Sequence, residues 1–295
     1  MTNIVVQLLY ERVARTFEER IALIEVGADV NTRDEDGNTS LMMAENAAQT
    51  KILLDHSADV NAKSNDGSTA LMCSKTAEQT RFLLESGADV NDKNIYDTTA
   101  LGCAISIDQI RLLIEAGADV NAKNCDKQTT LMYAKSVEET KLLIDHGADV
   151  NIEDKFGNTA LMNAKTAEQT DLLIKEGADV NAKNKDGQTA LMNAKSVEQT
   201  KILIEAAGAS AGAKSGDSIE AYVNAKDKDG NTALMYATSV EQIKILLDFG
   251  ADFNAKNKDG QTALMRAFTN NQKSILIDAM PDTYMNRLRG FWSRF

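Results

Sequence analysis

The side chains best suited to nucleophilic catalysis or metal binding are few and scattered in this sequence. It holds two histidines, His56 and His146, and three cysteines, Cys73, Cys103 and Cys125. Neither set has the close, paired spacing of a metal site or of a disulfide framework. No combination of Ser, His and Asp suggests an activated nucleophile. We therefore expect no catalytic residue, no metal and no cofactor, and we predict that the protein is not an enzyme.

One glycine-rich segment comes close to a phosphate-binding loop. Residues 208–215 follow the spacing of that motif and end in Lys214-Ser215, but Ala213 stands where the motif needs its second glycine. No strand precedes the segment, and no clear helix start follows it to aim backbone amides at a phosphate. We do not expect nucleotide binding here.

The carboxylates, by contrast, recur in a regular pattern. The phrase Gly-Ala-Asp-Val-Asn begins at Gly27 and returns, with small changes, every 30 residues up to Gly177, and once more at Gly250. Its aspartates are Asp29, Asp59, Asp89, Asp119, Asp149, Asp179 and Asp252. They are one structural position copied, and not a catalytic pair. A fixed period of this length indicates a repeat architecture.

A second phrase, Thr-x-Leu, keeps the same step and defines the elements of each repeat. The copy at Thr189 follows the turn signal Asp186-Gly187, and it predicts a short helix through about Lys195. Seven residues after each threonine stands an N-cap residue, followed three residues later by Gln or Glu, which is the pattern of a capping box. These N-cap residues are Asn46, Thr76, Ser106, Ser136, Thr166, Ser196, Ser239 and Thr269, and Thr16 with Glu19 makes a ninth capping pair outside the threonine spacing. A second helix follows each of them and ends at the glycine of the first phrase.

Neither helix of a repeat can bury its apolar face alone, so the repeats must stack on one another. The composition agrees, because 43% hydrophobic residues with only 5% aromatics and one proline favour short, closely packed helices over sheets. We predict an all-α helical-repeat solenoid of about eight repeats with caps at both ends, in which neighbouring repeats lie about 10 Å apart.

The two phrases resemble the ankyrin repeat, whose signature joins a turn, a Thr-Pro-Leu-His-x-Ala helix, a Leu-Leu helix and Gly-Ala-Asp-Val-Asn. The resemblance covers about residues 15–280. Here Ala-Leu-Met replaces Pro-Leu-His, so a histidine that ties neighbouring turns together in the family is missing. The repeat is also 30 residues long instead of 33. The resemblance implies a non-catalytic module for protein–protein interaction.

The period divides the chain into five segments. N-terminal capping helices are expected in residues 1–26, and ankyrin-like repeats in 27–206 and 223–280. The repeat breaks at 207–222, whose small, polar residues predict an inserted flexible loop. Residues 281–295 carry Phe291 and Trp292 among arginines. This tail either caps the last repeat or docks on a partner or a membrane surface.

Positions that depart from the repeat are the candidates for partner binding. At the turn tips, Tyr96 and Phe156 replace the usual aspartate, while Asp97 and Lys127 replace the glycine that follows it. The fourth residue after each threonine also varies. Because the second residue is always Leu and the fifth almost always Ala, both should face the core, and the fourth should face the concave side of the stack.

These fourth-position residues are Met43, Cys73, Cys103, Tyr133, Asn163, Asn193, Tyr236 and Arg266. Tyr133 and Tyr236 are the expected anchors, because aromatic side chains dominate interface energies. Met43, Asn163, Asn193 and Arg266, together with the turn tips and with Phe291 and Trp292, complete the predicted partner-binding set.

The net charge of −12 disfavours binding to nucleic acid, and the expected partner is another protein. Residues 1–176 have a net charge of −13 and residues 177–295 have +1, so the partner of the acidic half would be basic. Two alternatives remain open. The chain could be an acidic inhibitor or immunity-type protein that neutralises a basic toxin, nuclease or other enzyme. It could also be an enzyme regulator whose 207–222 loop or tail engages an active site.

Three further expectations concern the setting of the protein. No apolar run approaches the roughly 18 residues of a membrane span, and the first residues do not read as a secretory signal. Unpaired cysteines fit a reducing compartment. We expect a cytoplasmic protein that is monomeric on its own, although the sequence leaves delivery into another cell open.

Overall fold

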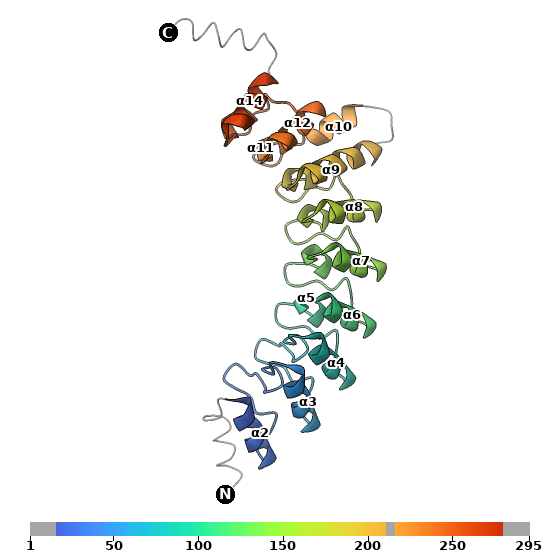
Figure 1. Cartoon of the computed structure of the whole chain (residues 1–295), viewed down its shortest axis with the longest axis vertical. Helices are drawn as coiled ribbons and strands as arrows, with labels where there is room; N and C mark the ends of the chain where they lie inside the picture. The colour runs from blue at the N-terminus through green and yellow to red at the C-terminus, as the bar shows by residue number, and fades with distance from the viewer. Residues whose placement is uncertain (1–15, 211–215, 280–295) are drawn as a thin grey trace, which may run out of the picture. The chain divides into compact units, whose positions relative to one another are not determined.

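The computed structural model describes residues 16–210 and 216–279 (Figure 1). By its internal contacts the chain divides into two compact units. Unit 1 comprises Met1–Thr130 and Lys141–Ala148, and unit 2 comprises Leu131–Thr140 and Asp149–Phe295. Of the predicted capping segment 1–26, residues 17–25 form a helix, and residues 1–15 lie outside the described part of the chain.

Both units are built from helices alone in the residues described. Unit 1 contains α2 (Phe17–Glu25), α3 (Ala47–Asp55), α4 (Ala77–Glu85), α5 (Ala100–Cys103) and α6 (Ile107–Glu115). Helix α7 (Val137–Asp145) crosses the boundary between the units. The 3-10 helix η1 (Thr130–Tyr133) also spans a boundary, because Thr130 belongs to unit 1 and the rest of the turn to unit 2. The other elements of unit 2 are η2 (Leu161–Asn163), α8 (Ala167–Lys175), η3 (Ala190–Asn193), α9 (Val197–Ser210), α10 (Gly216–Val223), α11 (Ala233–Tyr236), α12 (Val240–Asp248), α13 (Ala263–Arg266) and α14 (Asn270–Asp278). Within these residues an isolated bridge from Arg33 to Thr39 is the only strand-like pairing, so the predicted all-α repeat fold is confirmed.

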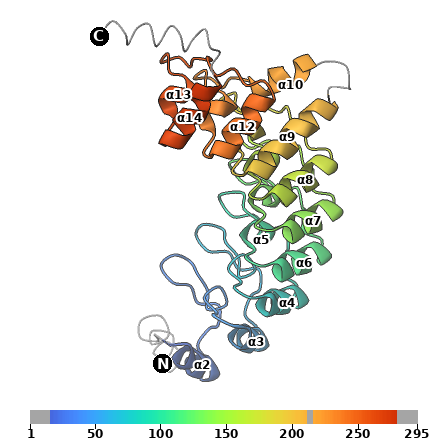
Figure 2. The same cartoon turned by 45° about the horizontal axis from the view of Figure 1, so that its top comes forward.

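Each repeat consists of a finger, a short helix or turn, and a long helix; residues 40–43 and 70–73 form turns instead of short helices. The finger is the turn between the asparagine of Gly-Ala-Asp-Val-Asn and the threonine of Thr-x-Leu, such as residues 182–188. In unit 1 the long helix α4 packs against α3 and α6, and in unit 2 the long helix α9 packs against α8 and α12 (Figure 2). Their leucines form the core, and Leu83, Leu113 and Leu203 are almost completely buried.

The long helices begin and end as their sequence signals predict. In α4 the hydroxyl of Thr76 accepts a hydrogen bond from the backbone amide of Gln79, 3.2 Å away, which satisfies a free amide of the first turn. After the helix, Gly87 adopts φ +88°, a conformation that favours glycine. The amide of Ala88 then returns to the carbonyl of Leu83 at 3.0 Å and closes the helix end.

The short helices are shorter than predicted. The helix expected to reach about Lys195 is a single 3-10 turn that ends at Asn193, and Ala194 is extended with ψ 127°. The reason is the shortened repeat, since the N-cap of the next helix, Ser196, follows only three residues after Asn193. The chain must turn at once, which leaves no room for a second helical turn.

The glutamine after each N-cap does more than the predicted capping box. A complete box forms at Thr16, Ser239 and Thr269, the last two of which have Gln as its partner. In α4, however, the side-chain oxygen of Gln79 accepts from the amide of Lys75, one residue before the N-cap. This correction follows from burial, because the glutamine side chain lies between repeats, where each of its polar atoms needs a partner.

The amide nitrogen of the same glutamine joins neighbouring repeats. In unit 1 the nitrogen of Gln79 donates to the carbonyl of Ala44 at 3.0 Å and to the hydroxyl of Thr50 at 3.2 Å. In unit 2 that of Gln199 donates to the carbonyl of Ala164 at 3.2 Å and to the hydroxyl of Thr170 at 3.1 Å. Stacking is therefore held by buried hydrogen bonds as well as by apolar burial.

A second ladder uses the Asp and Asn of Gly-Ala-Asp-Val-Asn. The side chain of Asn61 donates to the carbonyl of Gly87 at 3.0 Å and accepts from the amide of Asp89 at 2.8 Å. The Asp89 carboxylate in turn accepts from the amide of Asn91 within its own turn, at 3.0 Å. The recurring aspartate is thus a turn residue, as its repetition predicted.

Most threonines of the Thr-x-Leu phrase are buried, and several have a hydroxyl without a partner. Among the described residues this holds for Thr39, Thr69, Thr159, Thr189 and Thr232. Methionine occupies the position that is histidine in the family signature, and Met192 is buried beside Thr189. Because a thioether is at best a weak acceptor and cannot donate, the hydrogen bonds between repeats come from the glutamine and asparagine ladders instead.

The predicted loop at 207–222 is largely helical. Helix α9 continues to Ser210 instead of ending after nine residues, and α10 covers Gly216–Val223, so only residues 211–215 lie outside the described chain. The two helices pack closely, since a Cβ on Gly208 would lie 2.8 Å from the side chain of Ile219. Tyr222 is buried, and burial raises the pKa of its phenol. The small residues of this segment suggested a linker in the sequence. In the structure they allow helices α9 and α10 to pack closely against each other.

Candidate functional site

The finger tips are held side by side by backbone hydrogen bonds between neighbouring repeats. In unit 1 the amide of Ile95 donates to the carbonyl of Asp66, and the amide of Cys125 donates to the carbonyl of Tyr96, each at 2.8 Å. In unit 2 the amide of Lys185 donates to the carbonyl of Phe156 at 2.7 Å. Side chains at the tips are therefore presented at defined positions.

The tip residues singled out in the sequence are exposed. The side chain of Tyr96 is 55% exposed beside Ile95, which is also exposed, and Phe156 in unit 2 is 52% exposed. The ammonium of Lys155 lies 5.0 Å from the centre of the Phe156 ring, which is cation–π distance. Asp97 and Lys127 take φ +57° and +60°, so they do adopt the left-handed conformation of the glycines that they replace.

The fourth-position residues differ in exposure. In unit 1 Met43, Cys73 and Cys103 are half-buried, and desolvation raises the pKa of both thiols. In unit 2 Tyr133 is 52% exposed and Asn163 is exposed. Asn193 is half-buried, and its amide nitrogen lies 3.5 Å from the carbonyl of Met162.

Tyr236 and Arg266 belong to a polar network inside unit 2 instead of standing free. The phenol of Tyr236 donates to the Asp227 carboxylate at 2.6 Å, and desolvation together with this bond raises the pKa of the phenol. Arg266 donates to the side-chain oxygen of Asn231 at 2.9 Å, and its guanidinium lies 5.6 Å from the Tyr236 ring. Tyr236 is consequently held within unit 2, whereas the side chain of Tyr133 is 52% exposed.

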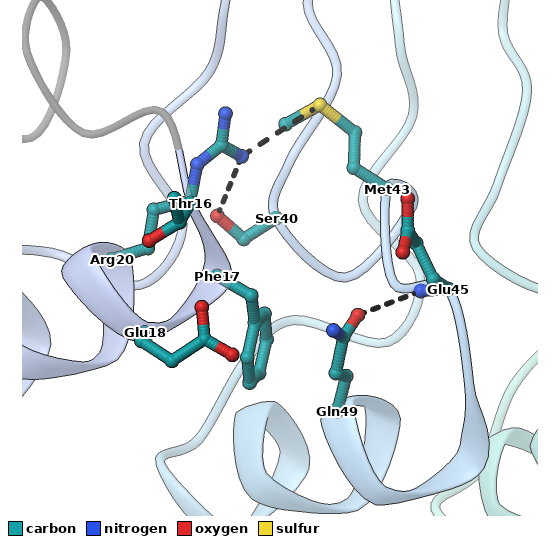
Figure 3. A pocket seen from close by; sticks show the side chains of 8 residues that line it. All are labelled: Thr16, Phe17, Glu18, Arg20, Ser40, Met43, Glu45 and Gln49. Atoms are coloured by element: carbon teal, nitrogen blue, oxygen red, sulfur yellow. Dashed lines mark hydrogen bonds between the residues drawn. The ribbon is translucent and has the colours of Figure 1, made fainter.

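A depression of about 410 Å³ lies in unit 1 between α2 and the repeat that follows it (Figure 3). Arg20 extends across it, with Nη1 3.5 Å from Ser40 Oγ and 3.7 Å from the sulfur of Met43. Phe17 and Gln49 form the opposite side. Its lining includes one predicted site residue, Met43. Of its polar side chains, Arg20 contacts Ser40, and Gln49 accepts a hydrogen bond from the backbone amide of Glu45. Nothing in the depression marks a reacting group.

Six lysines on the fingers of unit 2 were missed in the sequence. They are Lys183, Lys185, Lys226, Lys228, Lys256 and Lys258, and all are exposed. We call them the finger lysines. The signal was the pattern Lys-x-Lys in three successive fingers, which is hidden when charge is summed over a whole segment. Phe291 and Trp292, also predicted to bind, lie outside the described residues.

The side chains that could do chemistry are not brought together. Nδ1 of His56 lies 2.8 Å from the carbonyl of Ile52, and Nδ1 of His146 lies 2.8 Å from that of Leu142, so both rings contact their own helix end. All three cysteines are free thiols. Across residues 16–210 and 216–279, no group of three or more His, Cys, Asp and Glu side chains could hold a metal ion. No helix in the same ranges combines the length and apolar character that crossing a membrane requires.

Comparison with known proteins agrees with this architecture. The family model described as ankyrin repeats, in three copies, matches residues 5–94, 75–154, 101–172, 135–215, 163–242 and 209–278, which together run from 5 to 278. No curated protein matches the chain. Ankyrin repeats generally mediate protein–protein interactions, and the family is typically non-catalytic. The buried ladders, the stacked fingers and the family match lead to one conclusion: this chain belongs to the ankyrin-repeat family.

Proposed function

We propose that the chain is a protein-interaction module that holds a partner protein through its finger tips and the exposed side of its short helices, without covalent chemistry. One contrast supports this most directly. Side chains shared by most copies, such as Leu191 and Gln199, are buried, whereas the variable residues Tyr96, Tyr133 and Phe156 are more than half exposed. Exposed aromatic side chains are the usual anchors of protein interfaces.

The turn conformation adds to this argument. A lysine at φ +60° costs more than the glycine found in other fingers, and Lys127 accepts that cost at a finger tip. A residue retained against a conformational penalty is a candidate for function. Tyr96 and Asp97 occupy the neighbouring tip, so an aromatic and two charged side chains lie on adjacent fingers of unit 1.

The test is affinity capture from the native extract with the whole chain. The variant Tyr96→Ala/Tyr133→Ala/Phe156→Ala should lose the proteins that the wild type captures. A matched control, Phe82→Ala/Phe249→Ala, removes aromatic side chains from α4 and from the end of α12, and it should capture them normally. Equal capture by wild type and the triple variant would show that these anchors are wrongly assigned.

An acidic inhibitor of a basic protein is the second candidate. It is supported by the first finger of unit 1, where Asp34, Glu35 and Asp36 are consecutive and exposed. Interfaces of this kind weaken strongly as salt screens their charges. The triple substitution of these three residues by Asn, Gln and Asn should then abolish binding to the captured partner, whereas an aromatic-anchored interface would lose little.

The tail at 281–295 is proposed as a cap for the last repeat. In that repeat Met265 is exposed and Phe268 is 91% exposed, which is more than any other large apolar side chain described. Terminal repeats need a cover for such a face. The tail carries the apolar side chains to supply one, including Phe291 and Trp292.

A further inference from the structure

We propose that the finger lysines of unit 2 bind an extended, acidic segment of a partner protein. This proposal rests on the proposed function and adds the chemical class of the partner. It also reverses the charge expected from the sequence, in which the acidic N-terminal half pointed to a basic partner.

The finger lysines are turned outward by the residue between each pair. Asn184, Asp227 and Asn257 are buried, and each side chain accepts hydrogen bonds from amides of its own finger. The Asp227 carboxylate is held further by Tyr236. Since the middle side chain points inward, the lysines on either side of it point to solvent, and each finger presents two ammonium groups.

The three fingers are also held in a fixed row. The amide of Lys228 donates to the carbonyl of Asp186 at 2.6 Å, and the amide of Lys258 donates to that of Asp229 at 2.8 Å. Because these bonds join equivalent positions, Lys185, Lys228 and Lys258 follow one another at the repeat spacing. The ammonium of Lys226 reaches the carbonyl of Lys256 in the next finger at 3.3 Å, which aligns a second row.

Positive charge in unit 2 is concentrated on this side of the repeats. The finger and short-helix segments 182–196, 225–239 and 255–269 carry eight basic and four acidic side chains. The helices α9, α10, α12 and α14 carry three basic and seven acidic ones. No finger lysine forms a salt bridge to another described residue. Their charge is therefore available to an anionic partner.

The spacing fits an extended peptide. Neighbouring repeats lie about 10 Å apart. A peptide in the polyproline II conformation advances about 3.1 Å per residue with about three residues per turn, so every third side chain lies on the same side. Every third residue of such a peptide would meet a new finger. The matching ligand therefore has Glu or Asp at every third position along a stretch of three or more fingers.

A peptide fits better than a nucleic acid. The exposed carboxylates of Asp186, Asp229 and Asp259 stand at the same fingertips as the lysines. A nucleic acid carries closely spaced phosphates and would be repelled by these carboxylates, whereas a peptide can place its charges only opposite the lysines. The three fingers also carry no aromatic side chain on which a base could stack.

Fluorescence anisotropy with the whole chain tests the proposal. The probe is a labelled peptide of about 18 residues with glutamate at every third position and proline or alanine between, which favours the polyproline II conformation. It should bind at low salt and weaken as salt rises. The variant Lys185→Gln/Lys228→Gln/Lys258→Gln should lower its affinity at least about tenfold. The matched control Lys201→Gln/Lys244→Gln/Lys273→Gln removes three exposed lysines from α9, α12 and α14, and it should change the affinity less than about twofold.

Several outcomes would overturn the proposal. They are no binding of the glutamate peptide, equal binding of the same peptide with glutamine in place of glutamate, an equal loss in the control variant, and tighter, competing binding of a single-stranded oligonucleotide. Failure of the acidic-peptide proposal can be distinguished from failure of the proposed interaction function. If the finger variant keeps a captured partner that Tyr96→Ala/Tyr133→Ala/Phe156→Ala loses, the interaction module stands and only the acidic class of partner is wrong.

Discussion

The side-chain amide of Gln199 donates a hydrogen bond to the hydroxyl of Thr170, 3.1 Å away, and so joins two neighbouring repeats of unit 2. Both side chains are at most 2% exposed. The same amide also reaches the carbonyls of Ala164 and Thr166. A glutamine that looks like an ordinary helix cap in the sequence is therefore a contact between repeats.

Replacing this glutamine with an apolar residue of similar length should destabilise unit 2. In Gln199→Met the carbonyl of Ala164 and the amide of Lys195 lose a buried partner, which costs about 2–4 kcal/mol of unfolding free energy. Urea denaturation followed by circular dichroism measures the change. The control Glu198→Met alters an exposed neighbour on the same helix and should stay within about 0.5 kcal/mol. Similar losses in both variants would contradict a special role for the amide.

One substitution should have opposite effects at two buried threonines. The hydroxyl of Thr189 has no hydrogen-bond partner, whereas that of Thr170 accepts from Gln199 and donates to the carbonyl of Thr166 at 2.9 Å. Thr189→Val should therefore leave stability unchanged or raise it by up to about 1 kcal/mol, and Thr170→Val should lower it by about 1–3 kcal/mol. Thermal unfolding of the two single variants gives the comparison. A loss of equal size at both positions would mean that the Thr189 hydroxyl does have a partner.

Restoring glycine at a finger tip should stabilise unit 1. Lys127 has φ +60°, where a side chain is strained, so Lys127→Gly should raise the unfolding free energy by about 1 kcal/mol. Chemical denaturation measures the gain. If Lys127 contributes to the partner surface, the same variant should bind its captured partner less well. Lys123→Gly, in the same finger at an exposed residue without positive φ, serves as the control and should bring no gain in stability.

The three thiols should differ in their reaction with iodoacetamide. Cys125 is exposed, whereas Cys73 and Cys103 are half-buried, and desolvation raises the pKa of both. Because the thiolate is the reactive form, these two should be alkylated slowly near neutral pH and faster as the pH rises toward their raised pKa. Peptide mapping by mass spectrometry, after labelling at pH values of about 7 and 9, measures the extent of alkylation at each cysteine. Faster alkylation of Cys73 than of Cys125 in the folded chain would contradict the partial burial of Cys73.

Removing the tail should distinguish a cap from a docking peptide. If residues 281–295 cover Phe268 and Met265, truncation after Met280 should lower the melting temperature by several degrees, about 2–4 °C per kcal/mol lost. In a Phe268→Ser background, the truncation should lower the melting temperature less than it does in the wild type, because the substitution removes part of the apolar face that the tail would cover. An unchanged melt together with lost binding to the captured partner would identify the tail as a docking peptide instead.

The sequence by itself determined the fold of this protein. A period of 30 residues, a capping residue before every long helix of the repeats and a glycine after most of them are local signals. They placed the turns and the starts of these helices correctly, but not the extension of α9 or helix α10. The signals suffice because each repeat contacts mainly its neighbours, so that local patterns and nearest-neighbour packing decide the architecture.

Tertiary structure alone decided how the repeats are joined and which side chains are available. Only packing turns Gln199 toward Thr170, draws Tyr236 into hydrogen bonds with Asp227, and orders Gly208 against Ile219 in a segment that reads as a linker. Only the stacking of fingers places Lys185, Lys228 and Lys258 in one row. These features depend on contacts between residues far apart in the chain, and no local propensity reports the distance or the burial on which such contacts depend.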